Sequence, residues 1–296
     1  MTSPTRRTLI LAALAAAAIR PAAARPANWL YGLTIDDSWQ GKTRVADITA
    51  ALRILPRRPT VRLVMSHDTA PRAYQPLITA LRPVADIMAT PVDSYDMKHY
   101  RRTRDYLARF QEAYAAYGGA ISLWEIGNEI NGEDWLGNDP AFIADKARAA
   151  WQYIRAHGGK TALTAYHFAP GAQSLAMHDW LARYIPPAMR QGLDYLLVSY
   201  YEDDNDGYQP DWTAVFRALR PLFPHSALGI GECGKTAAGA DEAEKTALMR
   251  HYYHLHPPVE GYIGGGFWWY WVQDGVPADD NAFAQALAQT WAEAHH

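Results

Sequence analysis

Short apolar or β-branched runs alternate with longer amphipathic stretches along this chain, and eight such alternations constrain its fold more than any other feature. The short runs are typical of strands and the longer ones of helices. The predicted strands are residues 29–34, 60–65, 84–90, 121–126, 161–166, 195–200, 227–231 and 264–270. The predicted helices include residues 100–117, 142–157, 212–219, 242–254 and 281–293. This pattern predicts a closed parallel barrel, the (β/α)8 or TIM-barrel architecture of the α/β class.

An open, doubly wound sheet is the alternative architecture for such an alternation. That fold usually carries a glycine-rich phosphate-binding turn after its first strand. Residues 32–36 read Gly-Leu-Thr-Ile-Asp and contain only one glycine. No linker, charge run or low-complexity stretch divides residues 25–296, so we predict a single domain and favour the closed barrel.

The first 24 residues have the pattern of an export signal. Arg6 and Arg7 precede an apolar run over residues 9–19, and small residues follow at 21–24. The run is too short to span a bilayer, and the order of basic, apolar and small residues is that of a cleaved signal peptide. We therefore predict a signal peptide over 1–24, a catalytic domain over 25–296, and a periplasmic or secreted protein.

Two export routes fit the same residues. Residues 5–9 (TRRTL) resemble the twin-arginine pattern, in which the protein crosses the membrane already folded, and a Sec signal is the alternative. An N-terminal anchor helix is disfavoured, because alanine-rich runs insert poorly into bilayers. No later stretch is apolar enough to cross a membrane, and a single cysteine, Cys233, excludes an internal disulfide.

The composition favours one class of partner over two others. A formal net charge of −3 at pH 7 gives no basic field for nucleic acid or for an anionic membrane. The chain has 11 Trp and 18 Tyr but only 7 Phe. Trp and Tyr combine a flat apolar face with a polar edge, which suits stacking on sugar rings as well as filling cores. We therefore expect a polysaccharide or oligosaccharide substrate, no cofactor, no metal and a monomer.

Two glutamates follow directly on predicted strands. Glu129 ends the sequence Trp-Glu-Ile-Gly-Asn-Glu at the fourth strand, and Glu232 follows Gly-Ile-Gly at the seventh. In a barrel the chemistry gathers where strands end, and strands four and seven face each other across the mouth. Glycosidic cleavage needs two such carboxyl groups, one to protonate the leaving oxygen and one to attack or to activate water. Glu125, inside the strand, and Glu133, out on the loop, are the rival acids.

These strand ends resemble the clan of retaining (β/α)8-barrel glycoside hydrolases that includes cellulases, mannanases and galactanases. Members carry an Asn-Glu pair at the end of strand four and a Glu at the end of strand seven, as Asn128-Glu129 and Glu232 do here. The stretch from Gly127 to Gly132 is most similar to the endo-β-1,4-galactanases. The resemblance covers the barrel layout and short motifs at the strand ends, and no single family is assigned.

The resemblance implies a role for each matching residue. Glu129 is the expected acid/base, and Glu232 is the expected nucleophile of a double displacement that retains the anomeric configuration. Asn128 is expected to hydrogen-bond the sugar 2-hydroxyl. Arg62, in the second strand, is expected to hold the nucleophile ionised and oriented.

The remaining matches lie at the ends of strands six and eight. Tyr201 or Tyr200 matches the tyrosine beside the nucleophile, and Trp269 matches the tryptophan that floors the site. The sequence departs from many members at Ile130, where proline is common, and at Ser199, near which a histidine is common.

Four further side chains are expected to contact sugar. Trp39, Trp135 and Trp271 lie at or beyond the ends of strands one, four and eight, in positions suited to stacking on successive rings. His167 ends the fifth strand. This row of aromatic residues predicts an open cleft and endo action on a β-linked polysaccharide.

Two other functions stay open from the residues alone. One is a barrel that binds polysaccharide without cleaving it, although such a protein needs neither glutamate. The other is a metal-dependent polysaccharide hydrolase or deacetylase. Its candidate ligands are weak, because His251, His254 and His256 end a helix, where histidines suit the helix dipole. Residues 202–207 lack the closing glutamate of a calcium loop.

Overall fold

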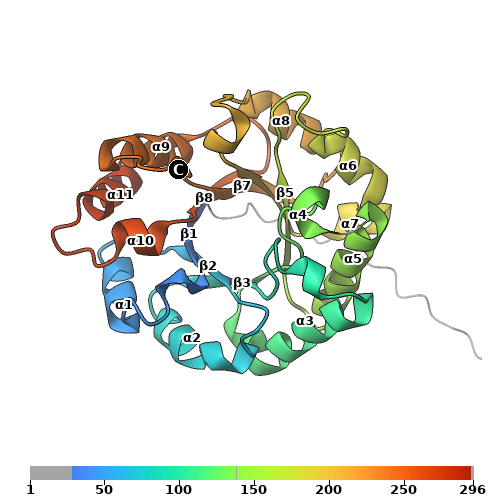
Figure 1. Ribbon diagram of the computed structural model, residues 1–296, viewed down its shortest axis with the longest axis horizontal. Helices are drawn as coiled ribbons and strands as arrows, with labels where there is room; N and C mark the ends of the chain where they lie inside the picture. The colour runs from blue at the N-terminus through green and yellow to red at the C-terminus, as the bar shows by residue number, and fades with distance from the viewer. Residues whose placement is uncertain (1–28, 138, 295–296) are drawn as a thin grey trace, which may run out of the picture.

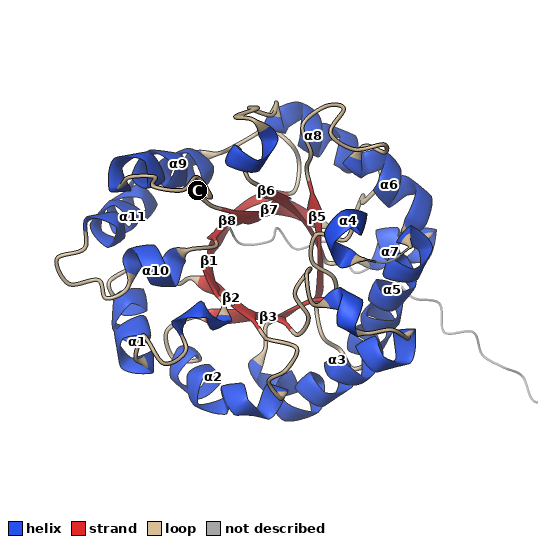
Figure 2. Cartoon of the chain, in the orientation of Figure 1, coloured by secondary structure: helices blue, strands red, loops and turns tan. Residues whose placement is uncertain are grey.

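The computed structural model of the chain describes residues 29–137 and 139–294. The predicted signal peptide over 1–24 lies outside these residues. Within them, eight strands close into one barrel in chain order, and helices surround it (Figures 1 and 2). The (β/α)8 barrel predicted from the alternation is confirmed.

The strands are short and almost wholly buried. They are β1 (Leu30–Ile35), β2 (Thr60–Val64), β3 (Asp86–Thr90), β4 (Leu123–Glu125), β5 (Thr161–Tyr166), β6 (Tyr195–Tyr200), β7 (Ala227–Cys233) and β8 (Tyr262–Trp268). Every neighbouring pair is parallel, and β1 pairs with β8 to close the ring. Because helices cover the outer face and side chains fill the interior, both faces of each strand are buried, which explains their apolar character.

The helices lie outside the strands as a surrounding ring (Figure 2). They are α1 (Val45–Arg53), α2 (Gln75–Leu81), α3 (Thr103–Tyr117), α4 (Glu133–Leu136), α5 (Pro140–Ala156), α6 (Met177–Tyr184), α7 (Pro187–Gly192), α8 (Trp212–Leu219), α9 (Glu242–His254), α10 (Trp271–Gly275) and α11 (Ala282–Glu293). Asp139, Asp211 and Asp241 cap α5, α8 and α9 by accepting backbone N–H groups of the first turn. In the part of the chain described, no helix combines the length and apolar character that crossing a bilayer requires.

Strand β8 begins and ends two residues earlier than predicted, at Tyr262 and Trp268. Three consecutive glycines lie inside it, where the sequence pattern suggests that the strand only begins. Gly264, Gly265 and Gly266 all have positive φ values and lie inside the strand. A Cβ atom at Gly265 would lie 2.0 Å from the carbonyl oxygen of Ile230 on β7. Glycine therefore allows the two backbones to approach at a point where their register shifts.

The interior of the barrel has an apolar floor beneath a polar layer. The floor is the buried cluster of Met88, Leu123, Ala162, Leu197 and Phe267. Residues two positions apart on a strand share a face. The first four floor residues are therefore followed on the same inward face by Thr90, Glu125, Thr164 and Ser199. These polar residues stand on the floor, at the end of the barrel where the strands finish.

Candidate active site

Glu232, at the end of β7, is held by two hydrogen-bond donors. The Tyr201 hydroxyl donates to its Oε1 at 2.6 Å, and Nη1 of Arg62 donates to its Oε2. Burial and then the charge of Glu232 raise the pKa of Tyr201 well above its ordinary value, so this hydroxyl keeps its proton. Glu232 is only 5% exposed and accepts through both oxygens, as a carboxylate does.

Glu129 lies just beyond β4, on backbone that still pairs with β5. The N–H of Ile130 donates to the carbonyl of Thr164 at 3.1 Å. Glu129 itself has a φ of +46°, in the left-handed region that residues other than glycine seldom adopt. Strain of this kind clusters at functional sites, where the surrounding fold fixes a side chain in place. Glu129 is 6% exposed, and its Oε1 accepts a hydrogen bond from the Ser199 hydroxyl at 2.7 Å.

Strand β6 brings the two carboxyl groups together. A register shift after Val198 sets Ser199 opposite Glu232 on β7. Ser199 and Tyr201 share a face ~6.6 Å apart along the strand. One of their hydroxyls bonds Glu129 and the other bonds Glu232. Burial, and then the negative charge of Glu232, raise the pKa of Glu129 well above its ordinary value. Glu129 therefore holds its proton more strongly than an ordinary glutamate does.

Arg62 lies inside the barrel between two carboxylates. Its Nε donates to Oε2 of Glu125 at 2.9 Å, and its Nη1 donates to Glu232. Thr90 donates to the same Oε2 of Glu125 at 2.6 Å, and Thr164 donates to Oε1. The side chains of Arg62 and Glu125 are fully buried. Glu125 is thus a partner of Arg62 rather than the acid that reaches a substrate.

Trp269 follows β8 directly and extends over Arg62. The guanidinium carbon of Arg62 lies 5.5 Å from the centroid of the Trp269 ring, within the range of a cation–π contact. The tryptophan is partly buried. It therefore lies beside the arginine that binds Glu232, and its contact with sugar stays a prediction.

Asn128 is joined to Asp93, a residue absent from the predicted site. Nδ2 of Asn128 donates to Oδ1 of Asp93 at 2.9 Å. Burial and the charge of Glu232 raise the pKa of Asp93 to about 6. The Oδ1 atom of Asn128 is buried and has no partner among the described residues, so it is available to a sugar hydroxyl. Asp93 follows the third strand, so the criterion of polar residues at strand ends finds it, but no motif assigns it a role.

The predictions for Tyr200 and Trp271 are wrong, because neither ring is accessible to a substrate. Tyr200 alternates with Ser199 and Tyr201 along the chain, so it points outward from the barrel. It is fully buried, and its hydroxyl donates to the carbonyl of Tyr208. Trp271 begins α10 and is 1% exposed within the main hydrophobic core.

His167 is also directed away from the two carboxyl groups. Its ring packs against those of Tyr200 and Trp212, with centroids 5.6 and 6.0 Å apart. Burial lowers the pKa of His167 to about 4, so its imidazole is neutral at neutral pH. These contacts pack the ring of His167 between β6 and α8, and its contact with sugar stays a prediction.

Aromatic rings stand at the rim of the site. The rings of Trp135, in α4, and Tyr95 are near parallel, with centroids 6.4 Å apart. Tyr95 is 58% exposed. Burial and then the charge of Glu129 raise the pKa of Tyr95, so its ring lies within the electrostatic field of Glu129. Trp39 is half-buried against the core. Tyr95 was not predicted, although it lies two residues after Asp93 in the same loop.

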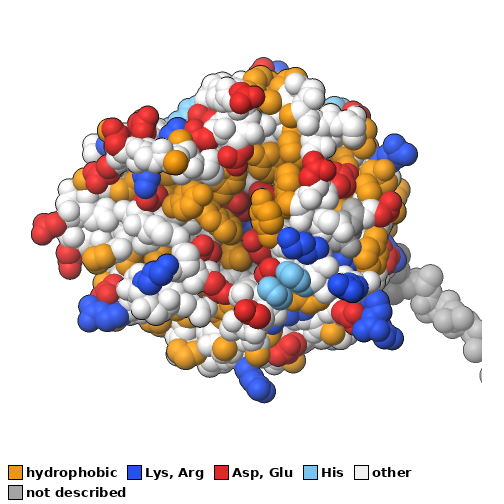
Figure 3. Space-filling view, viewed as in Figure 1, with side chains coloured by type: hydrophobic (Ala, Val, Ile, Leu, Met, Phe, Trp, Pro, Cys, Tyr) orange, Lys and Arg blue, Asp and Glu red, His pale blue; other side chains and the backbone are white. Residues whose placement is uncertain are grey.

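Figure 3 views the barrel end at which these side chains gather. Its centre is hollowed, acidic side chains are visible within the hollow, and apolar side chains border it. Among the described residues, one group of three His, Cys, Asp or Glu side chains has ligand atoms close enough to share a metal ion: His67, Asp96 and His99. Neither Glu129 nor Glu232 belongs to this group.

No protein-family model matches the sequence, and no curated protein matches it. Solved structures do match. Gas2p of Saccharomyces cerevisiae, in complex with laminaritriose and laminaritetraose, matches with a TM-score of 0.55 at 14% identity, over 90% of this chain and 65% of that one. A glucosidase from Croceicoccus marinus matches at 0.58 and 14% identity, over 90% and 67%. A family 1 β-glucosidase from Thermotoga maritima matches at 0.54 and 11%, over 77% and 83%.

These structures share the fold of the retaining (β/α)8 glycoside hydrolases. The resemblance to that clan, inferred from the strand ends, is confirmed at the level of fold. The chain spans 65% of the length of Gas2p. No single family within the clan is assigned.

Proposed function

We propose that this chain is a retaining β-glycosidase that cleaves β-linked oligosaccharide or polysaccharide and acts as a monomer. The observation that carries the proposal is the pair of hydroxyls on β6, because Ser199 binds Glu129 and Tyr201 binds Glu232. The charge of Glu232 also raises the pKa of Glu129, so the two carboxyl groups are electrostatic neighbours. Retaining enzymes hold such a pair about 5–5.5 Å apart, whereas inverting enzymes leave room for a water.

The proposed reaction uses the two glutamates in sequence. Glu232 attacks the anomeric carbon while Glu129 gives its proton to the leaving oxygen, so the glycosidic bond breaks and a glycosyl ester forms. Glu129, now ionised, then takes a proton from water, whose oxygen attacks the same carbon and releases Glu232. Arg62 and Tyr201 orient Glu232, and the free Oδ1 of Asn128 accepts a hydrogen bond from the sugar.

Endo action on a chain of several sugars is the second part of the proposal. Tyr95 and Trp135 offer near-parallel rings at the rim, and their π-faces suit stacking on sugars beyond the cleavage point. Gas2p has been solved with laminari-oligosaccharides. β-1,3-Glucan is therefore one substrate to test, beside β-1,4-linked glucan, mannan and galactan.

One assay separates this proposal from its two alternatives. Purified protein is incubated with a panel of native and acetylated β-linked polysaccharides, and reducing ends, acetate and product sizes are measured. We expect new reducing ends and oligosaccharides of several lengths. A protein that only binds polysaccharide gives neither product, and a deacetylase gives acetate without reducing ends. Release of monosaccharide alone would contradict endo action but not glycosidic cleavage.

A further inference from the structure

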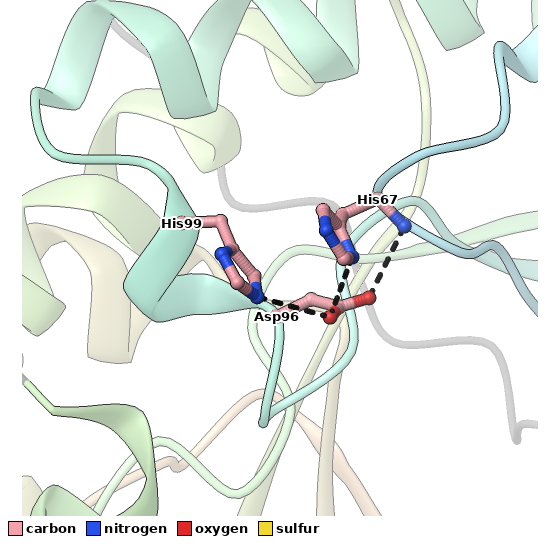
Figure 4. Close-up of side chains that lie close together, drawn as sticks. All are labelled: His67, Asp96 and His99. Atoms are coloured by element: carbon pink, nitrogen blue, oxygen red, sulfur yellow. Dashed lines mark hydrogen bonds and ion pairs between the residues drawn. The ribbon is translucent and has the colours of Figure 1, made fainter.

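Three side chains from two loops meet beside the mouth of the barrel. His67 follows β2, while Asp96 and His99 belong to the loop after β3. Nδ1 of His67 lies 2.9 Å from Oδ1 of Asp96, and Nε2 of His99 lies 3.9 Å from the same oxygen (Figure 4). One ligand atom from each residue lies within 4.8 Å of the other two. Two imidazoles thus converge on one carboxylate oxygen.

Backbone hydrogen bonds orient this carboxylate before any ligand arrives. The N–H of His67 donates to the other oxygen, Oδ2 of Asp96, at 3.1 Å, which leaves Oδ1 directed toward both rings. A turn joins Asp96 to His99, whose N–H donates to the Asp96 carbonyl at 3.0 Å. Met97, between them, is fully buried, and its carbonyl accepts from Lys146. The loop that presents two of the three groups is therefore anchored to the core.

The donor set selects one class of cation. Two imidazole nitrogens with one carboxylate oxygen suit Zn²⁺ and neighbouring transition metals, whereas Mg²⁺ and Ca²⁺ prefer oxygen alone. Bonds of about 2.1 Å in a tetrahedral site put ligand atoms about 3.4 Å apart. The two His–Asp separations of 2.9 and 3.9 Å lie on either side of that value.

The imidazole rings need a small rotation to share an ion. They are stacked with centroids 4.0 Å apart and planes 8° apart, so their nitrogen lone pairs lie in two nearly parallel planes and do not converge on one point between the rings. The side chains of His67 and His99 are 36% and 47% exposed, and exposed side chains change rotamer readily. Rotation therefore disturbs little beyond the stacking contact itself.

We propose that His67, Asp96 and His99 bind one divalent transition-metal ion, Zn²⁺ in the simplest case, at the rim of the cleft. The ion ties the loop after β2 to the loop after β3, and the second loop also carries Asp93 and Tyr95. The ion takes no part in cleavage, because Glu129 and Glu232 supply the groups that the proposed reaction needs. The ion is expected to stabilise the position of a loop that borders the proposed sugar site.

Isothermal titration of the tag-free chain with ZnCl2, in the absence of substrate, tests this site. We expect one Zn²⁺ per chain, no comparable binding of MgCl2, and affinity lowered by about tenfold or more in H99A and in H67A. Both side chains are exposed, so these variants keep the fold, which thermal unfolding of the metal-free proteins verifies. D96N provides a third variant at the shared ligand.

His178 provides the matched control. It forms an exposed His–Asp pair with Asp179, Nε2 to Oδ1 at 3.1 Å, and no third ligand joins this pair within residues 29–137 and 139–294. H178A is expected to bind Zn²⁺ as the unsubstituted chain does. Absence of Zn²⁺ binding, or binding that H67A, H99A and D96N leave unchanged, overturns the proposal. Because no substrate is present, this failure leaves the proposed glycosidase activity untouched.

Discussion

Glutamine at position 232 is expected to lower kcat by about 10⁴-fold or more, because the amide cannot form the glycosyl ester on which double displacement depends. Glu232 is the acceptor of both Tyr201 and Arg62, and Gln keeps the size of the side chain. Steady-state kinetics on the best substrate of the polysaccharide panel measures the loss. Activity within tenfold of the unsubstituted enzyme would remove Glu232 from the role of nucleophile.

Glu129→Gln is expected to lower the cleavage rate by a factor that depends on the leaving group of the substrate. General acid catalysis contributes about 10² to 10⁴-fold, so a natural sugar leaving group loses that factor, while an activated aryl leaving group, which needs no proton, loses little in the first step. The matched control is Glu133→Gln. Glu133 lies in α4 and accepts from the indole of Trp180, so this variant is expected to keep its activity.

The same substitution changes the dependence of rate on pH. Burial, and then the charge of Glu232, raise the pKa of Glu129, so the acid stays protonated at higher pH than an ordinary glutamate. kcat/KM is expected to fall on the alkaline side as Glu129 loses its proton. In Glu129→Gln, this alkaline fall is expected to disappear for activated substrates. If it persisted at the same pH, another group would be the acid.

Arg62→Met is expected to produce the largest loss of stability, about 3–5 kcal/mol, because it leaves buried carboxylates without their cation. Glu125 and Glu232 both bind this arginine, and Glu125 is fully buried. Urea unfolding measures the loss of stability, and kcat/KM on folded protein measures the loss of activity. Wild-type stability in Arg62→Met would contradict the buried ion-pair network.

The double variant Arg62→Met/Glu125→Gln distinguishes the two duties of Arg62. Glutamine at 125 keeps the size of the side chain and can still accept from Thr90 or Thr164 through its single oxygen, while its NH2 group faces the other hydroxyl and the charge that Arg62 compensates is removed. We therefore expect part of the stability to return while activity stays low, because Glu232 still lacks its partner. Full recovery of both would mean that Arg62 serves the fold alone.

The sequence predicted best those site residues that the closure of the barrel brings together. Arg62, Glu129 and Glu232 are far apart in the chain, but each lies on or near a strand end, so the closed ring alone brings them together. The observed bounds of β5 and β6 equal the predicted ones. In both strands a run of apolar, β-branched and aromatic residues gives way directly to loop residues. The fold and the central charged groups could therefore be inferred before any coordinates.

Side-chain direction was the part that the sequence did not determine. Tyr200 and Tyr201 are adjacent and chemically alike, and the structure identifies Tyr201 as the inward one because it shares a strand face with Ser199 and with Leu197 of the barrel interior. Trp271 follows Trp269 by two residues, but the chain turns into α10 there and buries it. Tyr95 lies in a loop without a motif, and its place near Glu129 follows only from the folded position of that loop.

Azide trapping connects the two glutamates to their separate roles. In Glu129→Ala, azide is expected to attack the glycosyl-enzyme in place of water and give a β-glycosyl azide. In Glu232→Gly, azide takes the position of the missing carboxylate and gives the α-azide from an activated substrate. An exchange of these two products would reverse the assignment of acid/base and nucleophile.

The most direct test of the account is the anomeric configuration of the first product released by the unsubstituted enzyme. Proton NMR follows the anomeric signals during the first minutes of cleavage of a β-linked oligosaccharide, before mutarotation mixes the two forms. Double displacement by Glu232 and Glu129 inverts the anomeric carbon twice, so the β-anomer is expected first. An α-anomer appearing first would show a single displacement by water and would contradict the proposed mechanism.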